Sequence, residues 1–75
     1  MYTIYSKPNC VYCLQAKQLL EMEQLPFEYK NLGTHYSLDE LMTLAPNAKS
    51  FPQVFKDGVL IGGFNNLVEY LNQQY

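Results

Sequence analysis

The residues with the clearest chemical potential are Cys10 and Cys13, the only cysteines in this 75-residue sequence. Two residues separate them and a helix-compatible segment follows, which is typical of a thiol–disulfide redox pair. Cys10 would lie at the helix N-terminus, where free N–H groups and the helix dipole favour a thiolate. Cys13 would lie on the same side of the helix, within reach of Cys10. The motif therefore predicts that Cys10 attacks disulfides and that Cys13 resolves the mixed disulfide.

Other roles for the cysteine pair agree less well with the sequence. A structural disulfide with this spacing would close too short a loop to stabilise the fold much. Zinc in structural sites normally has four ligands, and His35 is the only other soft ligand in the chain, so we expect no metal site. Lys7 places a positive charge near Cys10, which favours the reactive thiolate instead.

Composition narrows the class of protein. The chain is 48% hydrophobic, which is enough for a packed core in one small domain spanning residues 1–75. The formal net charge is −2 and arginine is absent, which argues against nucleic-acid binding. The first residues lack the features of a signal peptide, and no apolar run is long enough to span a membrane. We therefore expect a cytoplasmic protein with no membrane partner, and a monomer because no apolar face is left over.

The pattern of apolar residues predicts the elements that position the cysteines. Alternating, β-branched and aromatic residues predict strands over residues 2–5, 27–32, 52–55 and 59–61. Helical spacing predicts helices over residues 10–24, 38–45 and about 66–72. The covered face of the first helix is expected to contain Leu14, Ala16, Leu19, Leu20 and Met22. Lys56–Gly58, with its Asp-Gly pair, predicts a tight hairpin turn.

Polar residues mark where each helix is expected to begin. Asn9 is a suitable N-cap for the first helix, and Ser37 followed by Glu40 predicts a capping box for the second. Asn65 or Asn66 is expected to cap the last.

The order of elements predicts an α/β fold, β-α-β-α-β-β-α. The opening strand, helix and strand imply a parallel pair with a right-handed crossover, and the final hairpin adds antiparallel strands. The result is a four-stranded mixed sheet flanked by three helices. The cysteines would then lie at the C-terminal end of the first strand, where such folds place their chemistry.

Three motifs together resemble the glutaredoxin family, which has the thioredoxin-like fold. They are Cys10–Cys13, Phe51–Phe55 and Gly62–Leu67, in family order and at similar distances along the chain. The short length and the Val-Tyr pair between the cysteines are similar to the small dithiol glutaredoxins of bacteriophages.

The resemblance implies a role for each matched residue. Cys10 and Cys13 would be catalytic, with Cys10 forming a mixed disulfide with glutathione or a protein. Pro52 matches the family's cis-proline, and the Phe51 main chain would pair with an extended peptide such as glutathione. The glutathione or substrate contacts implied are Lys7, Val11, Tyr12, Phe51, Pro52, Gly63, Phe64, Asn65 and Asn66. Lys7 and the start of the last helix would meet the carboxylates of glutathione.

Some positions depart from the family pattern. Val11 stands where proline is frequent, and Phe51 is bulkier than the residue that usually precedes the cis-proline. Asn65 and Asn66 are neutral where the family often has an acidic residue that reaches the glutathione amino group. An amide accepts a hydrogen bond without the added strength of a charge.

The resemblance implies a glutathione-dependent dithiol–disulfide oxidoreductase. Its substrates would be protein disulfides and glutathione mixed disulfides, plausibly including ribonucleotide reductase, with glutathione as reductant and no permanent cofactor. The cytoplasm would be that of a host cell if a phage encodes the chain. One alternative is a thioredoxin-like donor that a flavoprotein reductase re-reduces. A second, of another class, is a non-catalytic module that binds a partner through Tyr12, Phe51 and Phe64.

Overall fold

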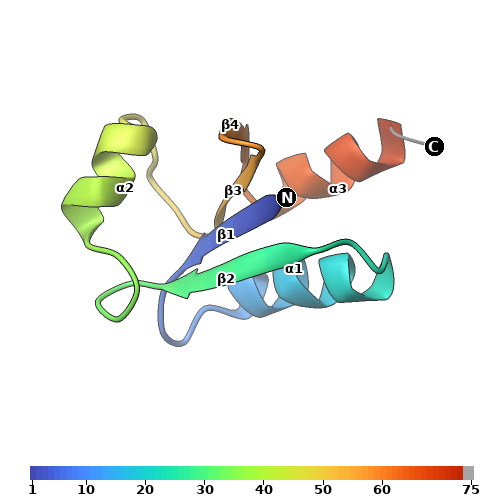
Figure 1. Cartoon of the computed structure of the whole chain (residues 1–75), viewed down its shortest axis with the longest axis horizontal. Helices are drawn as coiled ribbons and strands as arrows, with labels where there is room; N and C mark the ends of the chain where they lie inside the picture. The colour runs from blue at the N-terminus through green and yellow to red at the C-terminus, as the bar shows by residue number, and fades with distance from the viewer. Residues whose placement is uncertain (74–75) are drawn as a thin grey trace.

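The elements follow the predicted order along the chain (Figure 1). The computed structural model describes residues 1–73. It contains β1 (Tyr2–Ser6), α1 (Val11–Met22), β2 (Phe27–Asn31), α2 (Leu38–Leu44), β3 (Gln53–Lys56), β4 (Val59–Gly62) and α3 (Phe64–Gln73). The predicted α/β fold is confirmed, and the predicted element boundaries differ by one to two residues.

The four strands form one mixed sheet in the order β2-β1-β3-β4. β1 pairs with β2 in parallel, and the β1–β3 and β3–β4 pairs are antiparallel, as predicted. The β3–β4 turn has positive φ at both central residues, 51° at Asp57 and 83° at Gly58. Positive φ at both positions matches the right-handed twist of a hairpin and explains the Asp-Gly pair.

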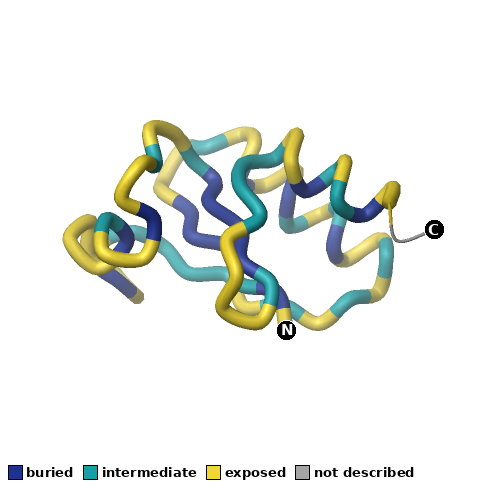
Figure 2. Tube along the Cα trace, turned by 90° about the horizontal axis from the view of Figure 1, so that it is seen from above, coloured by how far each residue is buried: buried dark blue, intermediate teal, exposed yellow. Residues whose placement is uncertain are grey.

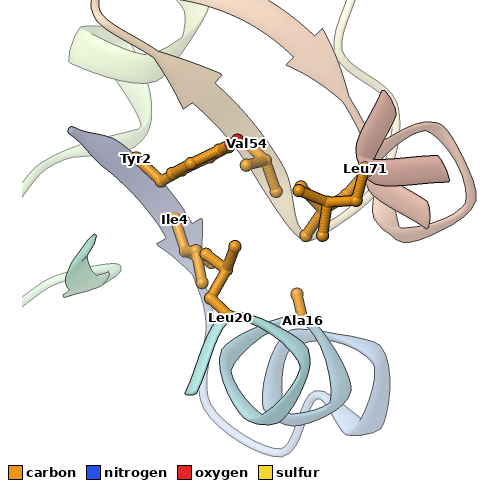
Figure 3. Close-up of a cluster of buried hydrophobic side chains, with 7 residues drawn as sticks. Tyr2, Ile4, Ala16, Leu20, Val54 and Leu71 are labelled. Atoms are coloured by element: carbon orange, nitrogen blue, oxygen red, sulfur yellow. The ribbon is translucent and has the colours of Figure 1, made fainter. Parts of the chain in front are cut away.

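Alternation along the central strands divides the core between the two faces of the sheet. Ile4 and Val54 face a cluster that α1 and α3 complete through Ala16, Leu20 and Leu71 (Figure 3). All five of these side chains are buried. Figure 2 shows the buried residues concentrated in the central strands and along the inner sides of the helices.

Tyr5 and Phe55, which follow Ile4 and Val54 on β1 and β3, face the opposite side of the sheet. Tyr5 and Phe55 pack edge to face, with ring centroids 5.3 Å apart, in a second cluster. Leu41 and Ala45, on α2 and at its C-cap, complete this cluster. In Figure 1, α2 accordingly lies at one end of the molecule, apart from α1 and α3.

The N-cap of the first helix lies one residue later than predicted. Cys10, rather than Asn9, is the N-cap of α1, and Asn9 has a left-handed φ of 59°. An N-cap needs extended backbone, which Cys10 has. The buried face of α1 is Cys13, Ala16 and Leu20, so the prediction that Leu14 and Met22 are covered was wrong.

The second helix begins as predicted. Ser37 Oγ accepts a hydrogen bond from the Glu40 N–H at 3.2 Å, and Glu40 Oε1 accepts one from the Ser37 N–H at 3.1 Å. No helix within residues 1–73 has the length and apolar character needed to cross a membrane.

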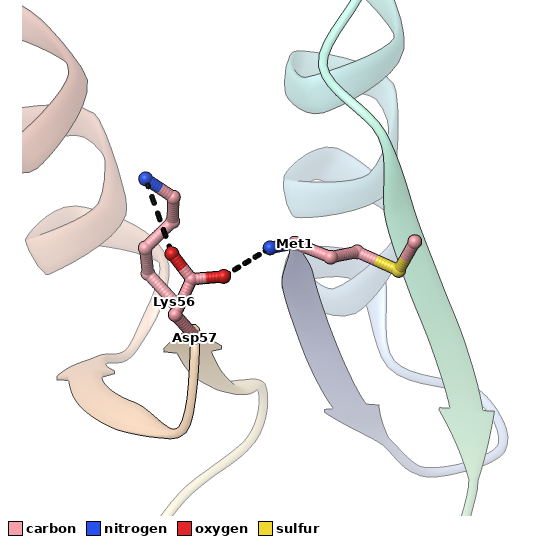
Figure 4. Close-up of polar contacts among 3 residues, drawn as sticks. All are labelled: Met1, Lys56 and Asp57. Atoms are coloured by element: carbon pink, nitrogen blue, oxygen red, sulfur yellow. Dashed lines mark hydrogen bonds and ion pairs between the residues drawn. The ribbon is translucent and has the colours of Figure 1, made fainter.

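An ion pair links the residue before β1 to the β3–β4 turn, at the end of β1 that lies away from the cysteines. The Met1 amino group pairs with Asp57 in the β3–β4 turn, and Lys56 Nζ lies 3.8 Å from the same carboxylate (Figure 4). The hydrogen bond from the amino group, more than its charge, lowers the pKa of Asp57. This contact ties the start of β1 to the hairpin, while the other end of β1 leads to the cysteines.

Candidate redox site

Cys10 and Cys13 form a disulfide at the N-terminus of α1. Their Cα atoms are 5.2 Å apart, and the bonded pair is the oxidised form of the motif. The Cys13 N–H donates to Cys10 Sγ at 3.1 Å, which makes the sulfur itself the cap of the helix. A thiolate at this position would receive the same N–H and the positive end of the helix dipole.

The two sulfurs differ in accessibility. Cys13 is 0% exposed, whereas Cys10 is half-buried. An incoming disulfide or thiol can therefore reach Cys10 but not Cys13. This geometry fits the predicted division into an attacking and a resolving cysteine.

A groove of about 650 Å³ lies between the start of α1, the loop before β3 and the start of α3, and Tyr12, between the two cysteines, is part of its lining. The Phe51–Pro52 peptide bond in its wall is cis, as expected. The predicted residues that line it are Tyr12, Phe51, Pro52, Gly63, Phe64, Asn65 and Asn66. The rings of Tyr12 and Phe64 form its rim, with centroids 6.0 Å apart.

The remaining predicted contacts lie elsewhere. Lys7 and Val11 line a second groove of about 480 Å³, which also contains Cys10. Lys7 Nζ lies 5.6 Å from the centroid of the Phe51 ring, a cation–π distance. Lys7 thus lies between the two grooves, because Phe51 belongs to the wall of the main one.

The start of α3 differs from the prediction. The helix begins at Phe64, so neither Asn65 nor Asn66 is its N-cap. Asn66 instead reaches back, and its Oδ1 accepts a hydrogen bond from the Gly63 N–H at 3.1 Å. The N–H groups of Phe64 and Asn65 have no acceptor within residues 1–73 and are free to bind a ligand.

Lys49 lines the main groove, and the sequence did not single it out. The other lysines each lie over an aromatic ring, as Lys17 does over Tyr29. Within residues 1–73, Lys49 has neither a ring nor a carboxylate partner, and no acidic residue lines the groove. The sequence did place Lys49 three residues before Pro52. That position indicates a binding residue only once the loop before β3 is known to form a wall of the groove.

The structure shows no sign of a metal centre in the part of the chain that it describes. No three His, Cys, Asp or Glu side chains of residues 1–73 converge on one point. His35 is instead held in the loop after β2, where its Nδ1 accepts a hydrogen bond from the Asn31 N–H at 2.9 Å.

Comparison with known proteins agrees with this site. The family profile for glutaredoxin matches residues 2–61. The chain is 40% identical over 85 positions to the glutaredoxin of Enterobacteria phage T4, which covers 93% of this chain and 98% of that protein. It is 37% identical over 68 residues to hybrid peroxiredoxin hyPrx5 of Haemophilus influenzae, covering 91% of this chain but 28% of that protein.

The fold is also similar to that of solved glutaredoxins. A buckwheat glutaredoxin–glutathione complex superposes with a TM-score of 0.81 at 23% identity, covering 97% of this chain and 69% of that chain. This likeness establishes the thioredoxin-like fold, while the family profile and the phage relative establish the family. With its buried and accessible cysteines joined at the cap of α1, this chain belongs to the glutaredoxin family of thiol–disulfide oxidoreductases.

Proposed function

We propose that this chain is a glutathione-dependent dithiol–disulfide oxidoreductase that reduces protein disulfides and glutathione mixed disulfides. The observation that carries the proposal is an accessible cysteine at a helix N-terminus beside a groove whose walls can hold a short anionic peptide. The non-catalytic alternative is not retained, because the family consists of thiol–disulfide oxidoreductases.

The reaction proceeds by two exchanges at Cys10. The Cys10 thiolate attacks one sulfur of the substrate disulfide, forms a mixed disulfide and releases the other sulfur as a thiolate. Cys13 then attacks Cys10 Sγ, which releases the second substrate thiol and leaves the Cys10–Cys13 disulfide. One glutathione thiolate opens this disulfide at Cys10, and a second glutathione releases the first as oxidised glutathione.

The main groove offers three kinds of contact to glutathione. The Phe51 main chain makes no hydrogen bond within residues 1–73, so it can pair with an extended peptide. The free N–H groups of Phe64 and Asn65 suit one carboxylate. Lys49, which lines the groove, suits the other, alongside Lys7, whose Nζ lies 5.6 Å from the centroid of the Phe51 ring in the groove wall. The buckwheat glutaredoxin, which shares the fold, has been solved with glutathione bound.

The first experiment measures turnover of a small glutathione mixed disulfide with glutathione, glutathione reductase and NADPH. A parallel assay replaces the glutathione system with thioredoxin reductase. Turnover in the first assay alone supports the proposal, and turnover in the second alone contradicts it.

Lys49→Gln tests the proposed carboxylate contact. The change is expected to raise the KM for glutathione about threefold to fivefold, since an ion pair at a partly open site contributes up to about 1 kcal/mol. Lys17→Gln is the matched control, because Lys17 is on α1 and lies over Tyr29, outside the groove. An equal KM in the two variants would remove Lys49 from the site.

A second candidate function is supported by one contact. Asn66 already occupies the Gly63 N–H, which leaves one donor fewer for a glutathione carboxylate. This favours re-reduction by a flavoprotein reductase, which needs the sulfur and not the peptide contacts. The thioredoxin reductase assay distinguishes the two.

The proposal also covers the cellular location, the oligomeric state and the protein substrates. The protein would act in a reducing cytoplasm, that of the host if a phage encodes it, as a monomer with disulfide-bearing protein substrates. Ribonucleotide reductase is a proposed substrate, to be tested by its turnover with this protein as the only electron donor.

A further inference from the structure

Tyr36 is a buried ionisable residue with no part in the exchange steps above. It lies between β2 and α2 and is 5% exposed. Its ring packs edge to face on Tyr5, with centroids 4.9 Å apart. Its hydroxyl donates a hydrogen bond of 2.6 Å to the carbonyl of Ser6, which also accepts the Leu32 N–H at 2.9 Å.

Ser6 is the last residue of β1, and both of its polar groups are fixed. It is 0% exposed, and its hydroxyl donates to the Lys30 carbonyl at 2.9 Å and lies 3.0 Å from Asn31 Oδ1. Tyr36, through the carbonyl, and β2, through the hydroxyl, therefore hold the end of the strand in place.

The loop that joins Ser6 to Cys10 has no such support. The main chain of residues 7–9 makes no hydrogen bond within the part of the chain that is described, and all three residues are exposed. The position of the loop is therefore set at its two ends, by Ser6 and by the start of α1. A displacement of Ser6 would therefore also displace Cys10.

We propose that the Tyr36 hydroxyl is a positioning group for Cys10, because it fixes the carbonyl at which the active-site loop begins. Loss of this hydrogen bond would leave the Ser6 carbonyl held by the Leu32 N–H alone, and a shift of this carbonyl would move the start of the loop and lengthen the contact from the Cys13 N–H to Cys10 Sγ. A weaker contact stabilises the thiolate less, so the pKa of the Cys10 thiol would rise. The inference rests on the proposed role of Cys10 as the attacking thiol, and it does not depend on the reductant.

Tyr36→Phe tests the hydroxyl with little change in packing. The ring remains, and the Ser6 carbonyl keeps the Leu32 N–H, so no buried acceptor is left unpaired. Burial, with a smaller effect of Tyr5, raises the pKa of Tyr36 to about 12, so the substitution removes no charge at neutral pH. Lys7, the charged side chain that lines the groove of Cys10, is unchanged.

The measurement is the rate at which iodoacetamide alkylates Cys10 in the reduced protein, followed from pH 4 to pH 9. Tyr36→Phe is expected to shift the midpoint to higher pH and to slow alkylation at pH 6 about threefold to tenfold. Disulfide-exchange kcat/KM should fall in parallel. Tyr2→Phe is the matched control, since Tyr2 is a buried tyrosine on β1, the strand of Ser6, and it donates no hydrogen bond to the Ser6 carbonyl.

Wild-type profiles for Tyr36→Phe, or equal shifts in Tyr36→Phe and Tyr2→Phe, would overturn the proposal. Placing 4-aminophenylalanine at position 36 keeps a donor there, and it is expected to restore the wild-type profile even if Tyr36→Phe does not fold. A profile displaced in this variant also overturns the proposal. Alkylation needs no glutathione. The test of Tyr36 therefore remains valid as long as iodoacetamide alkylates Cys10 of the wild-type protein, even if the glutathione assay shows no turnover.

Discussion

At the scale of single residues, the roles proposed for the two cysteines follow from their surroundings. The sulfur of Cys10 is accessible and serves as the cap of α1, while Cys13 is packed inside the molecule. Identity and spacing predicted this arrangement, because residues 10 and 13 at a helix start must face the same side. The sequence could not show how completely Cys13 would be covered, since that depends on the whole fold.

Separate serine substitutions test this division. Cys10→Ser is expected to abolish all exchange, because the remaining thiol, that of Cys13, is buried. Cys13→Ser is expected to retain turnover of glutathione mixed disulfides, which needs one thiol, and to lose reduction of protein disulfides. Steady-state rates on both substrate types measure the difference, and a Cys13→Ser protein inactive on both would exclude the one-thiol route.

The buried phenol of Tyr36 predicts a loss of stability at high pH. Its pKa is about 12 in the folded protein, chiefly because of burial, against about 10 in an unfolded chain. The unfolded state therefore releases its proton first, and stability present below pH 10 is lost between pH 10 and about 12. The free energy of unfolding should fall by up to about 1.4 kcal/mol per pH unit there.

Urea unfolding at pH 9, 10 and 11 measures this slope. Tyr36→Phe is expected to be less sensitive to pH than the wild type, whereas Tyr12→Phe, at an exposed position, should keep the wild-type slope. Identical slopes in all three proteins would show that Tyr36 ionises equally in both states.

At the scale of elements, the three helices begin in different ways, and only one beginning was predictable. The capping box of α2 is local, since Ser37 and Glu40 satisfy each other within one turn. The cap of α1 is a sulfur, which propensity does not favour, and Asn9 serves the loop instead. At α3 the asparagine lies inside the first turn and reaches back to Gly63.

Gly62 is expected to be intolerant of a side chain. Its φ is +128°, and a Cβ there would lie 2.6 Å from Asn66 Oδ1. Gly62→Ala should therefore displace Asn66, destabilise the protein by about 1–3 kcal/mol and disturb the main groove. Gly58→Ala is the control, because Gly58 also has positive φ but faces open space.

Chemical denaturation and glutathione KM measure the two effects. Gly58→Ala should lose stability and keep its KM, whereas Gly62→Ala should change both. Equal behaviour of the two variants would mean that the contact with Asn66 has no functional consequence.

At the scale of the whole molecule, the sheet separates two cores that share its central strands. The order of elements and the alternation of apolar residues were enough to predict the sheet and the helices. They could not predict the groove, because its walls come from segments distant in the sequence, such as Tyr12 and Phe64. For the same reason the sequence did not single out Lys49, which lines the main groove.

Both cores are expected to contribute to one unfolding transition. Leu20→Ala, in the core under α1, and Leu41→Ala, in the core under α2, should each cost about 2–5 kcal/mol, because both side chains are 0% exposed. Leu44→Ala is the control on α2, at a leucine that is 50% exposed. Thermal unfolding followed by circular dichroism measures this, and two separate transitions would mean that the faces unfold independently.

The burial of Cys13 beneath Cys10 has a consequence for the order of binding. In the proposed exchange, every electron pair would enter and leave the protein through a single atom, the Sγ of Cys10, so oxidant and reductant would compete for one place. The first product must depart before the second substrate can react, which defines a ping-pong scheme. Double-reciprocal plots at several fixed reductant concentrations are therefore expected to be parallel, and lines that intersect would require both substrates to be bound together.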